Sequence, residues 1–421
     1  MKILVLGSGA REHAIVLALA SETAHHELLA APGNAGIARD ARIVDVDMLD
    51  PQGVTQFAKA EAVDLVVVGP EAPLVAGVAD ELRAHGIPVF GPGKRAAQLE
   101  GSKAFAKRIM EQAGVPTGRA VHARTAADVA AALDDFGAPY VVKADGLAAG
   151  KGVIVTEDRD AALAHADEYL PQGSVLVEEF LTGPEVSLFF LSDGDTVRAL
   201  APAQDFKRAL DGDAGPNTGG MGAYSPLTWL GERFGSIEAF VQEVTDTVAL
   251  PVVRELDRDG SPFIGLLYAG LILTPAGVRV IEFNARFGDP ETQIVLPRLA
   301  TPLSTLLMAA ADGTLEEQPD PQFRDEAAVT VVLASDGYPA SPRTGRAIEG
   351  LEEAEAVEGV HIAHAATARE GDALIATGGR VLNVVATGAT FAEARGRAYE
   401  AMSRIRLEGA HFRTDIAAAV A

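Results

Sequence analysis

The sequence predicts a protein built from several α/β and α+β domains, and three observations lead to this prediction. Its 421 residues correspond to about three domains, because a single domain usually spans roughly 100–200 residues. The chain opens with an apolar run at 2–6, a glycine turn at 7–9 and a helical pattern at 11–20, which is the start of a parallel α/β sheet. A Pro-rich acidic stretch at 316–326 precedes a final series of strand patterns.

The first 100 residues are predicted to form an N-terminal parallel α/β domain. Further strands are expected at 27–31, 65–69 and 87–90, and each is followed by a turn containing Gly and Pro. Ligands bind at the carboxyl ends of the strands in such sheets, so these turns are candidate ligand loops.

The rest of the chain is expected to form three further parts. Residues 101–120 and 190–325 are predicted to form a central core, residues 121–189 a small α+β unit, and residues 326–421 a C-terminal α+β domain. The small unit is indicated by a glycine-rich loop between strand patterns and by another strand at 174–179.

The composition excludes several classes of function. Lys and Arg number 35 and Asp and Glu number 59, so the formal net charge is −24, which argues against nucleic acid as a partner. Because the chain has no cysteine, disulfides, thiolate chemistry and Cys-type zinc sites are excluded. No stretch approaches the roughly 20 apolar residues of a transmembrane helix, and the first apolar run is too short for a secretion signal. We therefore expect a cytoplasmic protein without a membrane partner.

The N-terminal turn Gly7-x-Gly9 follows a strand, which is typical of a phosphate bound at a helix N-terminus. Glu12 stands where a dinucleotide-binding fingerprint has its third glycine, and the second strand ends at Asn34 without an acidic residue. A nicotinamide-dependent dehydrogenase is therefore disfavoured. Two interpretations remain: a turn needed only for packing the helix on the sheet, and a site for a different phosphate ligand.

A second glycine-rich segment begins at Lys143 and contains Gly146, Gly150, Lys151 and Gly152. It differs from a Walker A loop because the spacing is one residue short, the required Ser or Thr is absent, and a strand pattern follows. We interpret it as a flap between two antiparallel strands that closes over a triphosphate, with Lys143 beside the α- and β-phosphates. The alternative is a glycine hairpin without a ligand.

The segment 175–181 is a candidate adenine pocket. A strand here runs into an acidic and apolar stretch, in which Phe180 and Leu181 would cover the ring while backbone groups read its edge. Glu185 would accept hydrogen bonds from the ribose. The alternative is that the glutamates at 178 and 179 are simply solvated.

The segment 280–291 indicates a metal site. On a strand, Glu282, Asn284 and Arg286 would share one face, because side chains two residues apart point the same way. Mg²⁺ prefers hard oxygen ligands, usually one or two carboxylates together with substrate phosphates. Arg286 adds a guanidinium that can bind a carboxylate or a phosphate. An exposed polar face is disfavoured, because the intervening positions are apolar and the preceding strand 265–273 is expected to be central.

A long glycine-rich loop at 215–226 follows the charged segment 204–208. Such a loop inside a domain is more often a binding loop than a spacer. Its repeated backbone N–H groups are expected to bind an anionic substrate or intermediate.

Taken together, these segments resemble the ATP-grasp superfamily and, within it, the phosphoribosylamine–glycine ligase (glycinamide ribonucleotide synthetase) family of purine biosynthesis. The following motifs occur in the order of that family: GSGAREHA, APGNAG, VVGPEAPL, GPGKRAAQLEGSKAF, KADGLAAGKGV, VEEFLTGPEVS, GPNTGGMGAYSP, GLLYAGL and EFNARFGDPETQ. The resemblance continues into the C-terminal region through GYP at 337–339 and RTG at 343–345. It implies a pre-ATP-grasp N-terminal domain, an ATP-grasp core with a small mobile lid at 121–189, and a C-terminal domain.

The resemblance also implies a reaction and its cofactors. ATP, with Mg²⁺ or Mn²⁺, phosphorylates the carboxylate of glycine, and the amine of 5-phosphoribosylamine attacks the glycyl phosphate. The products are glycinamide ribonucleotide, ADP and phosphate. No protein nucleophile is needed, because the phosphate carries the activated acyl group. The family is typically monomeric, and we expect a monomer here.

Residue roles follow from the resemblance at the matching positions. It assigns ATP to Lys103, Lys143, Gly146, Gly150, Lys151, Gly152, Glu178, Glu179, Phe180, Leu181 and Glu185, and the metal to Glu282 and Asn284. It assigns phosphoribosylamine to Gly9, Asn34 and Glu71, and glycine to Asp205, Thr218, Gly219, Gly220 and Arg286. Asp289 is also expected to bind substrate. Asp205, Lys207 and Arg286 are the expected catalytic residues, with Lys207 stabilising the transferring phosphate.

The sequence departs from the family pattern at three places. Phe206 stands where a histidine is expected, and GSGA replaces the more usual GNGG. Many ATP-grasp enzymes also have a carboxylate on the strand before the Glu-x-Asn strand, whereas the strand 265–273 has none. Glu282 and Asn284 are therefore expected to be the main protein ligands of the metal.

Two other functions share part of this pattern. Another carboxylate–amine ligase of the same architecture would keep the nucleotide and metal residues, but the first-domain loops and the loop at 215–226 favour the glycine enzyme. A non-catalytic nucleotide sensor is disfavoured by the intact set of Glu282, Asn284 and Arg286.

Overall fold

The N-terminal part of the chain forms a five-stranded parallel sheet with the strand order β3-β2-β1-β4-β5. The structure is a computed structural model that describes residues 1–146 and 152–421. The strands are β1 (Lys2–Gly7), β2 (Glu27–Pro32), β3 (Arg42–Ile43), β4 (Leu65–Val68) and β5 (Val89–Phe90). The helices around it are α1 (Ala10–Ala20), α2 (Pro51–Ala60), α3 (Glu71–Ala76) and α4 (Val78–Ala84). The apolar run at 3–6 is buried on both faces, as a central parallel strand requires.

The predicted parallel α/β sheet is thus confirmed, although its edges differ from the expectation. The strand expected at 87–90 begins only at Val89, because the N–H of Ile87 bonds to the carbonyl of Leu82 and closes the preceding helix. The short strand β3 was not expected. Strands β2 and β4 flank β1 on opposite sides, so successive strands are added first to one side of β1 and then to the other. In a parallel sheet this change of side leaves a crevice at the carboxyl ends of β1 and β4.

The central sheet is antiparallel, with the order β11-β10-β16-β17. Its strands are β10 (Glu185–Asp193), β11 (Val197–Ala199), β16 (Ile264–Thr274) and β17 (Gly277–Asn284). The helices of this part are α5 (Gln98–Gly101), α6 (Lys103–Ala113), α9 (Leu230–Phe234), α10 (Ile237–Val244), α11 (Leu250–Arg258), α12 (Thr292–Val295) and α13 (Leu303–Asp312). Helix α13 packs against β10, β16 and β5, and so joins the central sheet to the edge of the N-terminal one.

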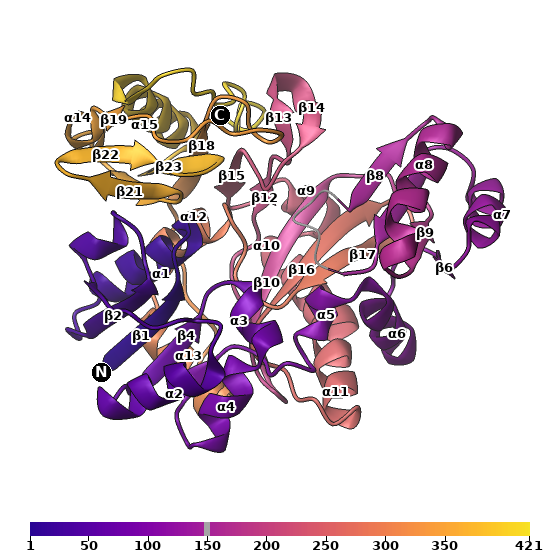
Figure 1. Ribbon diagram of the computed structural model, residues 1–421, viewed down its shortest axis with the longest axis horizontal. Helices are drawn as coiled ribbons and strands as arrows, with labels where there is room; N and C mark the ends of the chain where they lie inside the picture. The colour runs from indigo at the N-terminus through magenta and orange to yellow at the C-terminus, as the bar shows by residue number, and fades with distance from the viewer. Residues whose placement is uncertain (147–151) are drawn as a thin grey trace.

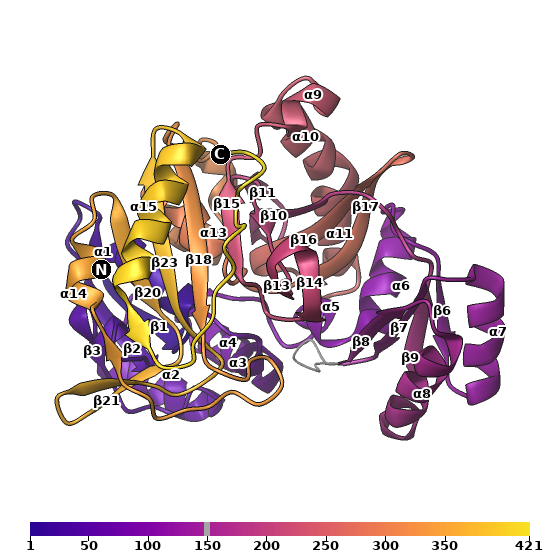
Figure 2. The same cartoon turned by 90° about the horizontal axis from the view of Figure 1, so that it is seen from above.

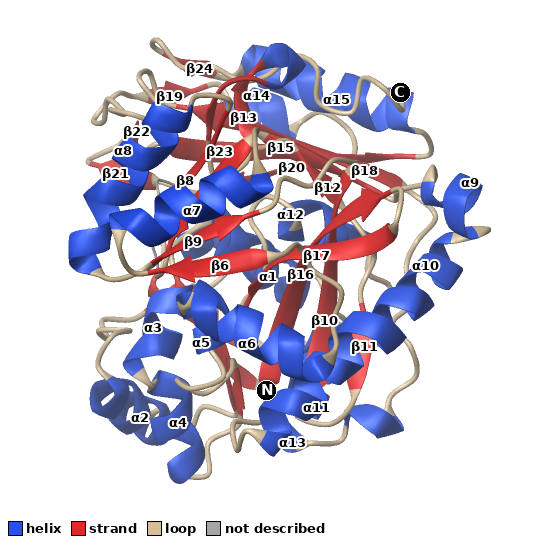
Figure 3. Ribbon diagram, turned by 90° about the vertical axis from the view of Figure 1, so that its right-hand side faces the viewer, coloured by secondary structure: helices blue, strands red, loops and turns tan. Residues whose placement is uncertain are grey.

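A small four-stranded sheet, β6-β9-β7-β8, lies at one end of the molecule, away from the N- and C-terminal parts (Figures 1 and 2). Its elements are β6 (Ala120–Ala123), β7 (Tyr140–Ala144), β8 (Val153–Thr156), β9 (Val175–Glu178), α7 (Ala126–Phe136) and α8 (Arg159–Tyr169). Both helices pack on one face of the sheet (Figure 3). Val142 and Val177 point toward the helices, so the alternating residues Lys143 and Glu178 belong to the opposite face.

The last sheet, β12-β15-β18-β23-β20, combines residues from two distant parts of the chain. Its strands are β12 (Gln204–Asp205), β15 (Gly222–Ser225), β18 (Ala327–Ala334), β20 (Val360–His364) and β23 (Arg380–Gly388), and it carries α14 (Leu351–Glu355) and α15 (Phe391–Arg404). Three two-stranded ribbons complete the fold: β13 (Arg208–Leu210) with β14 (Ala214–Asn217), β19 (Ile348–Glu349) with β24 (Arg406–Leu407), and β21 (Thr367–Glu370) with β22 (Ala373–Ala376). The segment 204–225, which includes most of the glycine-rich loop, is therefore joined to the C-terminal part by the pairing of β15 with β18.

Among the helices of residues 1–146 and 152–421, none combines the length and the hydropathy that crossing a membrane requires.

The pairing of β15 with β18 leaves no room for a side chain at Gly222. A Cβ there would lie 2.6 Å from the carbonyl oxygen of Thr330 and 2.8 Å from the side chain of Ile416. We expect Gly222→Ala to destabilise the protein by about 1–3 kcal/mol, because overpacking forces the neighbouring strands apart. Thermal unfolding measures the change. Gly231→Ala is the matched control: it lies in α9 with no atom near the new Cβ, and should leave the midpoint unchanged or raise it. Equal midpoints for the two variants would contradict this account of the pairing.

Candidate functional site

A cavity of about 540 Å³ lies where the N-terminal sheet, the central sheet, the small sheet and the C-terminal part meet. The predicted site residues that line it are Glu71, Lys103, Lys143, Gly146, Gly152, Glu178, Asp205, Lys207, Thr218, Gly219, Glu282, Asn284, Arg286 and Asp289. Seven other predicted residues lie outside this lining: Gly9, Asn34, Glu179, Phe180, Leu181, Glu185 and Gly220. Gly150 and Lys151 lie outside the described residues.

Strand β17 contains a β-bulge beside the cavity. Glu282 is paired with Gly270 of β16. Val280 is paired with the neighbouring Leu271, so Ile281 is an additional residue in β17. Bulges commonly re-aim a side chain next to an active site.

The bulge reverses which residues of β17 face the core. Val278 and Val280 are buried before it, and Phe283 is buried after it. Glu282 and Asn284 therefore line the cavity instead of continuing the buried series. Neither side chain has a hydrogen bond or an ion pair with another described residue, so their oxygens are free to bind a ligand.

Tyr268 takes the place beside Asn284 where the sequence has no carboxylate. The two residues are paired across β16 and β17, and Tyr268 also lines the cavity. Its hydroxyl donates to Glu291 Oε1 at 2.7 Å, and the Ser187 hydroxyl donates to the same oxygen at 3.0 Å. Burial, together with the nearby charge of Asp205, raises the pKa of Glu291. A carboxyl group is thus present next to the Tyr268 hydroxyl, and it comes from Glu291, which follows β17, and not from β16.

Two lysines share one buried carboxylate on the small sheet. Lys143 Nζ lies 2.7 Å from Glu178 Oε2, and Lys107 Nζ lies 3.3 Å from Oε1. Burial alone would raise the pKa of Glu178, but the two ammonium groups lower it. Burial likewise opposes the charge of Lys143, yet the carboxylates, Glu178 foremost, raise its pKa. Strands β7 and β8 are antiparallel, which confirms the predicted hairpin.

Lys103 begins helix α6 on the other side of the cavity. Its Nζ donates to the carbonyl oxygen of Gly146 at 3.2 Å. Burial lowers the pKa of Lys103, and the charge of Glu282 opposes this shift. Lys103, Lys143 and Glu282 are therefore close enough to influence one another electrostatically.

The segment after β9 has one exposed aromatic ring. Phe180 is 45% exposed, and Glu179 is bound through its carboxylate to the backbone N–H (2.9 Å) and the guanidinium (3.1 Å) of Arg119. Leu181 lies beside Gly118, whose added Cβ would be 3.4 Å from the leucine side chain. The adenine pocket remains a prediction, with Phe180 free to cover a ring.

Lys207 is held between two carboxylates. Its Nζ donates to Glu185 Oε2 at 2.6 Å and to Asp205 Oδ1 at 2.9 Å. Burial alone would lower the pKa of Lys207, but Asp205 and Glu185 raise it well above its ordinary value. Glu185 was assigned to the ribose from the resemblance, and in the structure it also fixes Lys207. The ring of Phe206 lies under the guanidinium of Arg413, at 4.9 Å, so this side chain packs against the C-terminal part.

Arg286 is held by two acidic residues, one of which has a largely buried side chain. Its Nη2 lies 2.9 Å from Glu100 Oε1, and its Nε lies 3.6 Å from Glu71 Oε2. Glu100 Oε2 also accepts the N–H of Ala285 at 2.8 Å, and burial raises the pKa of Glu100. Arg286 therefore reaches the cavity in a fixed position, beyond the end of β17.

The glycine-rich loop uses three of its backbone N–H groups for hydrogen bonds within the protein, and the binding of an anion by the loop remains a prediction. The N–H of Thr218 donates to the carbonyl of Lys207 at 2.8 Å, and that of Gly219 to the hydroxyl of Tyr338 at 3.0 Å. The N–H of Gly220 donates to Thr218 Oγ1 at 3.0 Å. These bonds fix the backbone of the loop, and Thr218 and Gly219 line the cavity.

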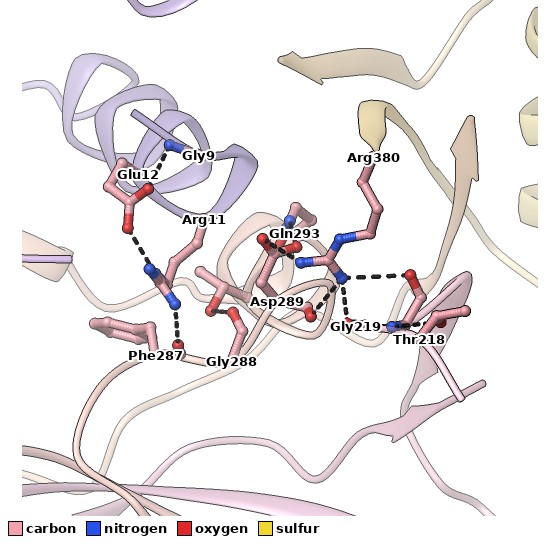
Figure 4. A network of polar contacts seen from close by, with 12 residues as sticks. Gly9, Arg11, Glu12, Thr218, Gly219, Phe287, Gly288, Asp289, Gln293 and Arg380 are labelled. Atoms are coloured by element: carbon pink, nitrogen blue, oxygen red, sulfur yellow. Dashed lines mark hydrogen bonds and ion pairs between the residues drawn. The ribbon is translucent and has the colours of Figure 1, made fainter. Parts of the chain in front are cut away.

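Asp289 is paired with Arg380, a residue of β23 (Figure 4). Arg380 Nη2 lies 2.9 Å from Asp289 Oδ2, and Gln293 Nε2 donates to Asp289 Oδ1 at 2.8 Å. Both Asp289 and Arg380 line the cavity. This carboxylate, which was predicted to bind substrate, is thus already paired with a cation of the protein.

The N-terminus of α1 is closed by its own glutamate (Figure 4). The N–H of Gly9 donates to Glu12 Oε2 at 2.6 Å, and Arg11 Nε donates to Glu12 Oε1 at 2.6 Å. The expected use of the Gly9 amide for a phosphate is therefore not available. Glu12 fills the space that a third glycine would leave open, since a Cβ on Gly7 would lie 2.4 Å from it.

The side chain of Asn34 is also fully used inside the protein. Its Nδ2 donates to the carbonyls of Ser8 and His364, both at 2.8 Å. Its Oδ1 accepts the N–H groups of Gly36 and Ile37, both at 2.9 Å. The Asn34 amide thus ties the first-domain loop to the end of β20, and any substrate contact must come from the loop around it.

Comparisons with known proteins decide the family. Three family models match the chain: phosphoribosylglycinamide synthetase N domain at 1–100, its ATP-grasp (A) domain at 101–292, and its C domain at 328–419. The chain belongs to the phosphoribosylglycinamide synthetase family.

Individual relatives of this family cover the whole chain. The phosphoribosylamine–glycine ligase of Leifsonia xyli subsp. xyli is 70% identical, over 99% of this chain and 100% of that protein. The Streptomyces coelicolor protein of the same name is 60% identical, over 100% of both. The crystal structure of phosphoribosylamine–glycine ligase from Thermotoga maritima superposes with a TM-score of 0.81 at 32% identity, covering 99% of this chain and 100% of that one.

Membership of the phosphoribosylglycinamide synthetase family confirms three predictions made from the motifs. The chain is a carbon–nitrogen ligase with an ATP-grasp domain, it has the expected N-terminal, ATP-grasp and C-terminal parts, and it acts in purine biosynthesis. As an ATP-grasp protein it binds ATP together with a divalent metal ion.

Seven further polar residues of the site were not identified from the sequence. They are Arg11, Glu100, Lys107, Tyr268, Glu291, Tyr338 and Arg380, all of which line the cavity. Glu100 and Glu291 lie in the motifs that carried the resemblance, so their place in these motifs was the signal that was available. Arg380 carried no such signal, because only the pairing of β23 with β18 brings it to the cavity.

The shared carboxylate of Glu178 predicts a measurable stability difference. Glu178→Gln leaves the buried ammonium of Lys143 without its closest carboxylate, and breaking a buried pair costs about 3–5 kcal/mol. We expect a clearly lower thermal midpoint. The control is Glu179→Gln, which breaks a more exposed pair with Arg119 and should cost at most about 1 kcal/mol. A Glu178→Gln midpoint equal to that of the control would show that the buried pair contributes little.

Proposed function

We propose that this chain joins the carboxylate of glycine to the amine of 5-phosphoribosylamine, using ATP, through a glycyl phosphate intermediate. The products are glycinamide ribonucleotide, ADP and phosphate. The observation that carries the proposal is the position of Arg286 beside Glu282 and Asn284 in one cavity, an arrangement that would hold a substrate carboxylate next to the triphosphate. The names and high identities of the full-length relatives support the same reaction.

The nucleotide is proposed to bind between the small sheet and the central sheet. Lys103, Lys143 and the glycine flap would surround the phosphates, and Phe180 would cover the adenine. Because Lys143 is already fixed by Glu178, it contributes a positive charge whose position does not have to be organised when ATP binds. Glu185 would bind the ribose with the oxygen that does not hold Lys207.

Glu282 and Asn284 are proposed as the protein ligands of the metal. A carboxylate and an amide oxygen, both without a bonded partner among the described residues and both facing the cavity, suit Mg²⁺ or Mn²⁺, which take hard oxygen ligands and substrate phosphates. Among the described residues, no cluster of three or more His, Cys, Asp or Glu could hold a metal alone, which fits a site completed by the nucleotide. When bound, the metal would neutralise the charge that builds up on the transferring phosphate.

Glycine is proposed to bind between Arg286 and Asp205. Its carboxylate would pair with the guanidinium, which is held in position by Glu100. Its ammonium group would bind to Asp205, whose side chain is 7% exposed and contacts Lys207. Lys207 would then lie next to the carboxylate as it accepts the phosphoryl group and would stabilise the added negative charge.

Phosphoribosylamine is proposed to bind at the crevice between β1 and β4. Glu71 follows β4 and Arg11 follows β1, and both line the cavity on this side. The amides of Gly9 and the side chain of Asn34 are already bonded within the protein, so Arg11 and other first-domain backbone groups are the remaining partners for the 5′-phosphate.

We further propose residues 121–189 as a lid, residues 101–120 and 190–325 as the ATP-grasp core, and a monomer in the cytoplasm. Large apolar side chains are exposed only singly among the described residues, at Met1, Ile43, Leu49, Val155, Phe180 and Leu210. The net charge of −24 argues against nucleic acid as a partner.

The metal assignment is tested with Glu282→Gln. The variant keeps the shape of the side chain and removes the charge, so we expect an intact fold and a kcat lower by about 100-fold or more, because metal binding contributes several kcal/mol to the transition state. Binding of Mn²⁺ in the presence of ATP, followed by electron paramagnetic resonance, should weaken in parallel. Glu232→Gln, at an exposed position of α9, is the control. Normal turnover and Mn²⁺ binding in Glu282→Gln would exclude this ligand.

The reaction itself is tested by omission. Purified protein is incubated with ATP, Mg²⁺, glycine and freshly generated phosphoribosylamine, and ADP release is measured with each component left out in turn. Rapid release should require both glycine and the sugar amine. If another amine or another carboxylate replaces them with equal efficiency, a different ligase of the same architecture is the correct assignment.

A further inference from the structure

We propose that the C-terminal part of the chain sets the geometry of the glycine site through two positioning residues, Arg380 and Tyr338. Together they hold the backbone of Gly219 and Gly220 against Asp289. The inference rests on the proposed function, since it takes the loop at 218–220 to be part of the glycine site. It assigns a task in substrate binding to a part of the chain that carries no ATP-grasp motif.

Arg380 connects two loops that belong to different segments (Figure 4). Its Nη1 donates to the carbonyl oxygens of Gly219 and of Gly220, the latter at 3.3 Å. The same nitrogen donates to the carbonyl oxygen of Asp289 at 2.9 Å, while Nη2 pairs with the Asp289 carboxylate at 2.9 Å. A planar guanidinium can make such contacts at the same time, and a lysine ammonium has no equivalent geometry.

Tyr338 holds the other side of the same residue, Gly219. Its hydroxyl accepts the N–H of Gly219 at 3.0 Å, so this residue is bound at its N–H by Tyr338 and at its carbonyl by Arg380. The tyrosine ring in turn lies against Gly379, where a Cβ would be 2.3 Å from a ring carbon. Gly379 and Arg380 are adjacent in sequence, so the start of β23 positions both Tyr338 and Arg380. We call these two residues the clamp.

The sheet explains why residues so far apart in sequence meet. Val332 of β18 donates its N–H to the carbonyl of Met221 at 3.0 Å, directly after the loop. Strand β23 pairs with the other edge of β18, and the register shifts where Ala334 is paired with Arg380. The irregularity lies at the cavity end of the strand, where a bulge can re-aim a side chain.

The loop also fits closely against its surroundings. A Cβ on Gly220, whose φ is +108°, would lie 2.5 Å from the ring of Pro290. A Cβ on Gly219 would lie 3.0 Å from the Arg380 guanidinium carbon. The backbone therefore has little freedom while Arg380 is in place. Without it, Asp289 would remain as a largely buried carboxylate that has lost its cation, and both loops would shift.

The arrangement differs from ordinary packing because Arg380, Tyr338 and the loop all line the substrate cavity. Displacing a binding group by about 1 Å can cost roughly 100-fold in rate, even when the altered residue never touches the substrate. The nucleotide contacts at Lys103 and Lys143 lie on other elements and do not depend on the clamp. The effect of losing it should therefore fall on glycine rather than on ATP.

The test measures KM for glycine and for ATP separately in Arg380→Met and Arg380→Lys. We expect KM for glycine to rise about 10- to 100-fold in Arg380→Met, with KM for ATP changed less than about twofold. Arg380→Lys keeps the charge opposite Asp289 and should recover part of the loss. Arg343→Met is the matched control, because Arg343 lies in the same part of the chain, is 67% exposed and forms an exposed ion pair with Asp336.

Tyr338→Phe provides a second and milder variant, which removes only the acceptor of the Gly219 N–H. It should raise KM for glycine by about 3- to 10-fold, corresponding to the loss of one hydrogen bond. If Arg380→Met is too unstable to purify, this variant carries the test. An unchanged KM for glycine in folded variants, or equal increases for glycine and ATP, would overturn the inference. If the wild-type protein releases ADP without requiring glycine, the proposed function itself fails, and the two failures are thereby distinguished.

Discussion

The arrangement of the cavity depends on the pairing of its positive side chains with carboxylates of the protein. Within residues 1–146 and 152–421, each cationic residue of the lining except Lys103 is bound in this way. The pairs are Arg11 with Glu12, Lys107 and Lys143 with Glu178, Lys207 with Asp205, Arg286 with Glu100, and Arg380 with Asp289. A protein with a net charge of −24 thereby keeps a set of cations at fixed positions for anionic ligands.

These pairs connect stability with the chemistry of the site. A buried cation is costly unless an anion accompanies it, so each cation that is to meet a substrate brings a partner with it. The partner also fixes the direction of the cationic group, which reduces what must be organised when the ligands bind. Lys103 is the exception, and it lies near Glu282, whose carboxylate has no cationic partner among the described residues. The nucleotide and its metal would complete that region. The site therefore has one part whose charges are already paired and another part whose charges would be paired only when the ligands bind.

The sequence was sufficient for the overall architecture, because periodic apolar runs and glycine turns are local signals. It was also sufficient to predict that Glu282 and Asn284 face one site, although the physical reason is different from the one expected. A strand of strict period would have continued the buried series of Val278 and Val280, and it is the bulge at Ile281 that turns these side chains to the cavity. Residues such as Arg380 could not be found in this way, because their position is set by strand pairing over long distances in sequence. The amides of Gly9 and of the glycine loop had local acceptors, Glu12 and Thr218, which a motif alone does not reveal.

The sheet that joins β15 to β18 and β23 has a consequence for how the protein is made. Residues 222–225 leave the ribosome about 100 residues before β18 and about 160 before β23. One edge of β15 can pair at once with β12, which precedes it in the chain, but at a synthesis rate of roughly 5–20 residues per second the other edge waits on the order of 5–20 seconds for β18. During that interval the N-terminal sheet can already be complete, since all its strands precede residue 91. The half of the cavity that we propose binds glycine is therefore the last to be assembled on the nascent chain, and a chaperone that shields an unpaired strand edge would act at this stage.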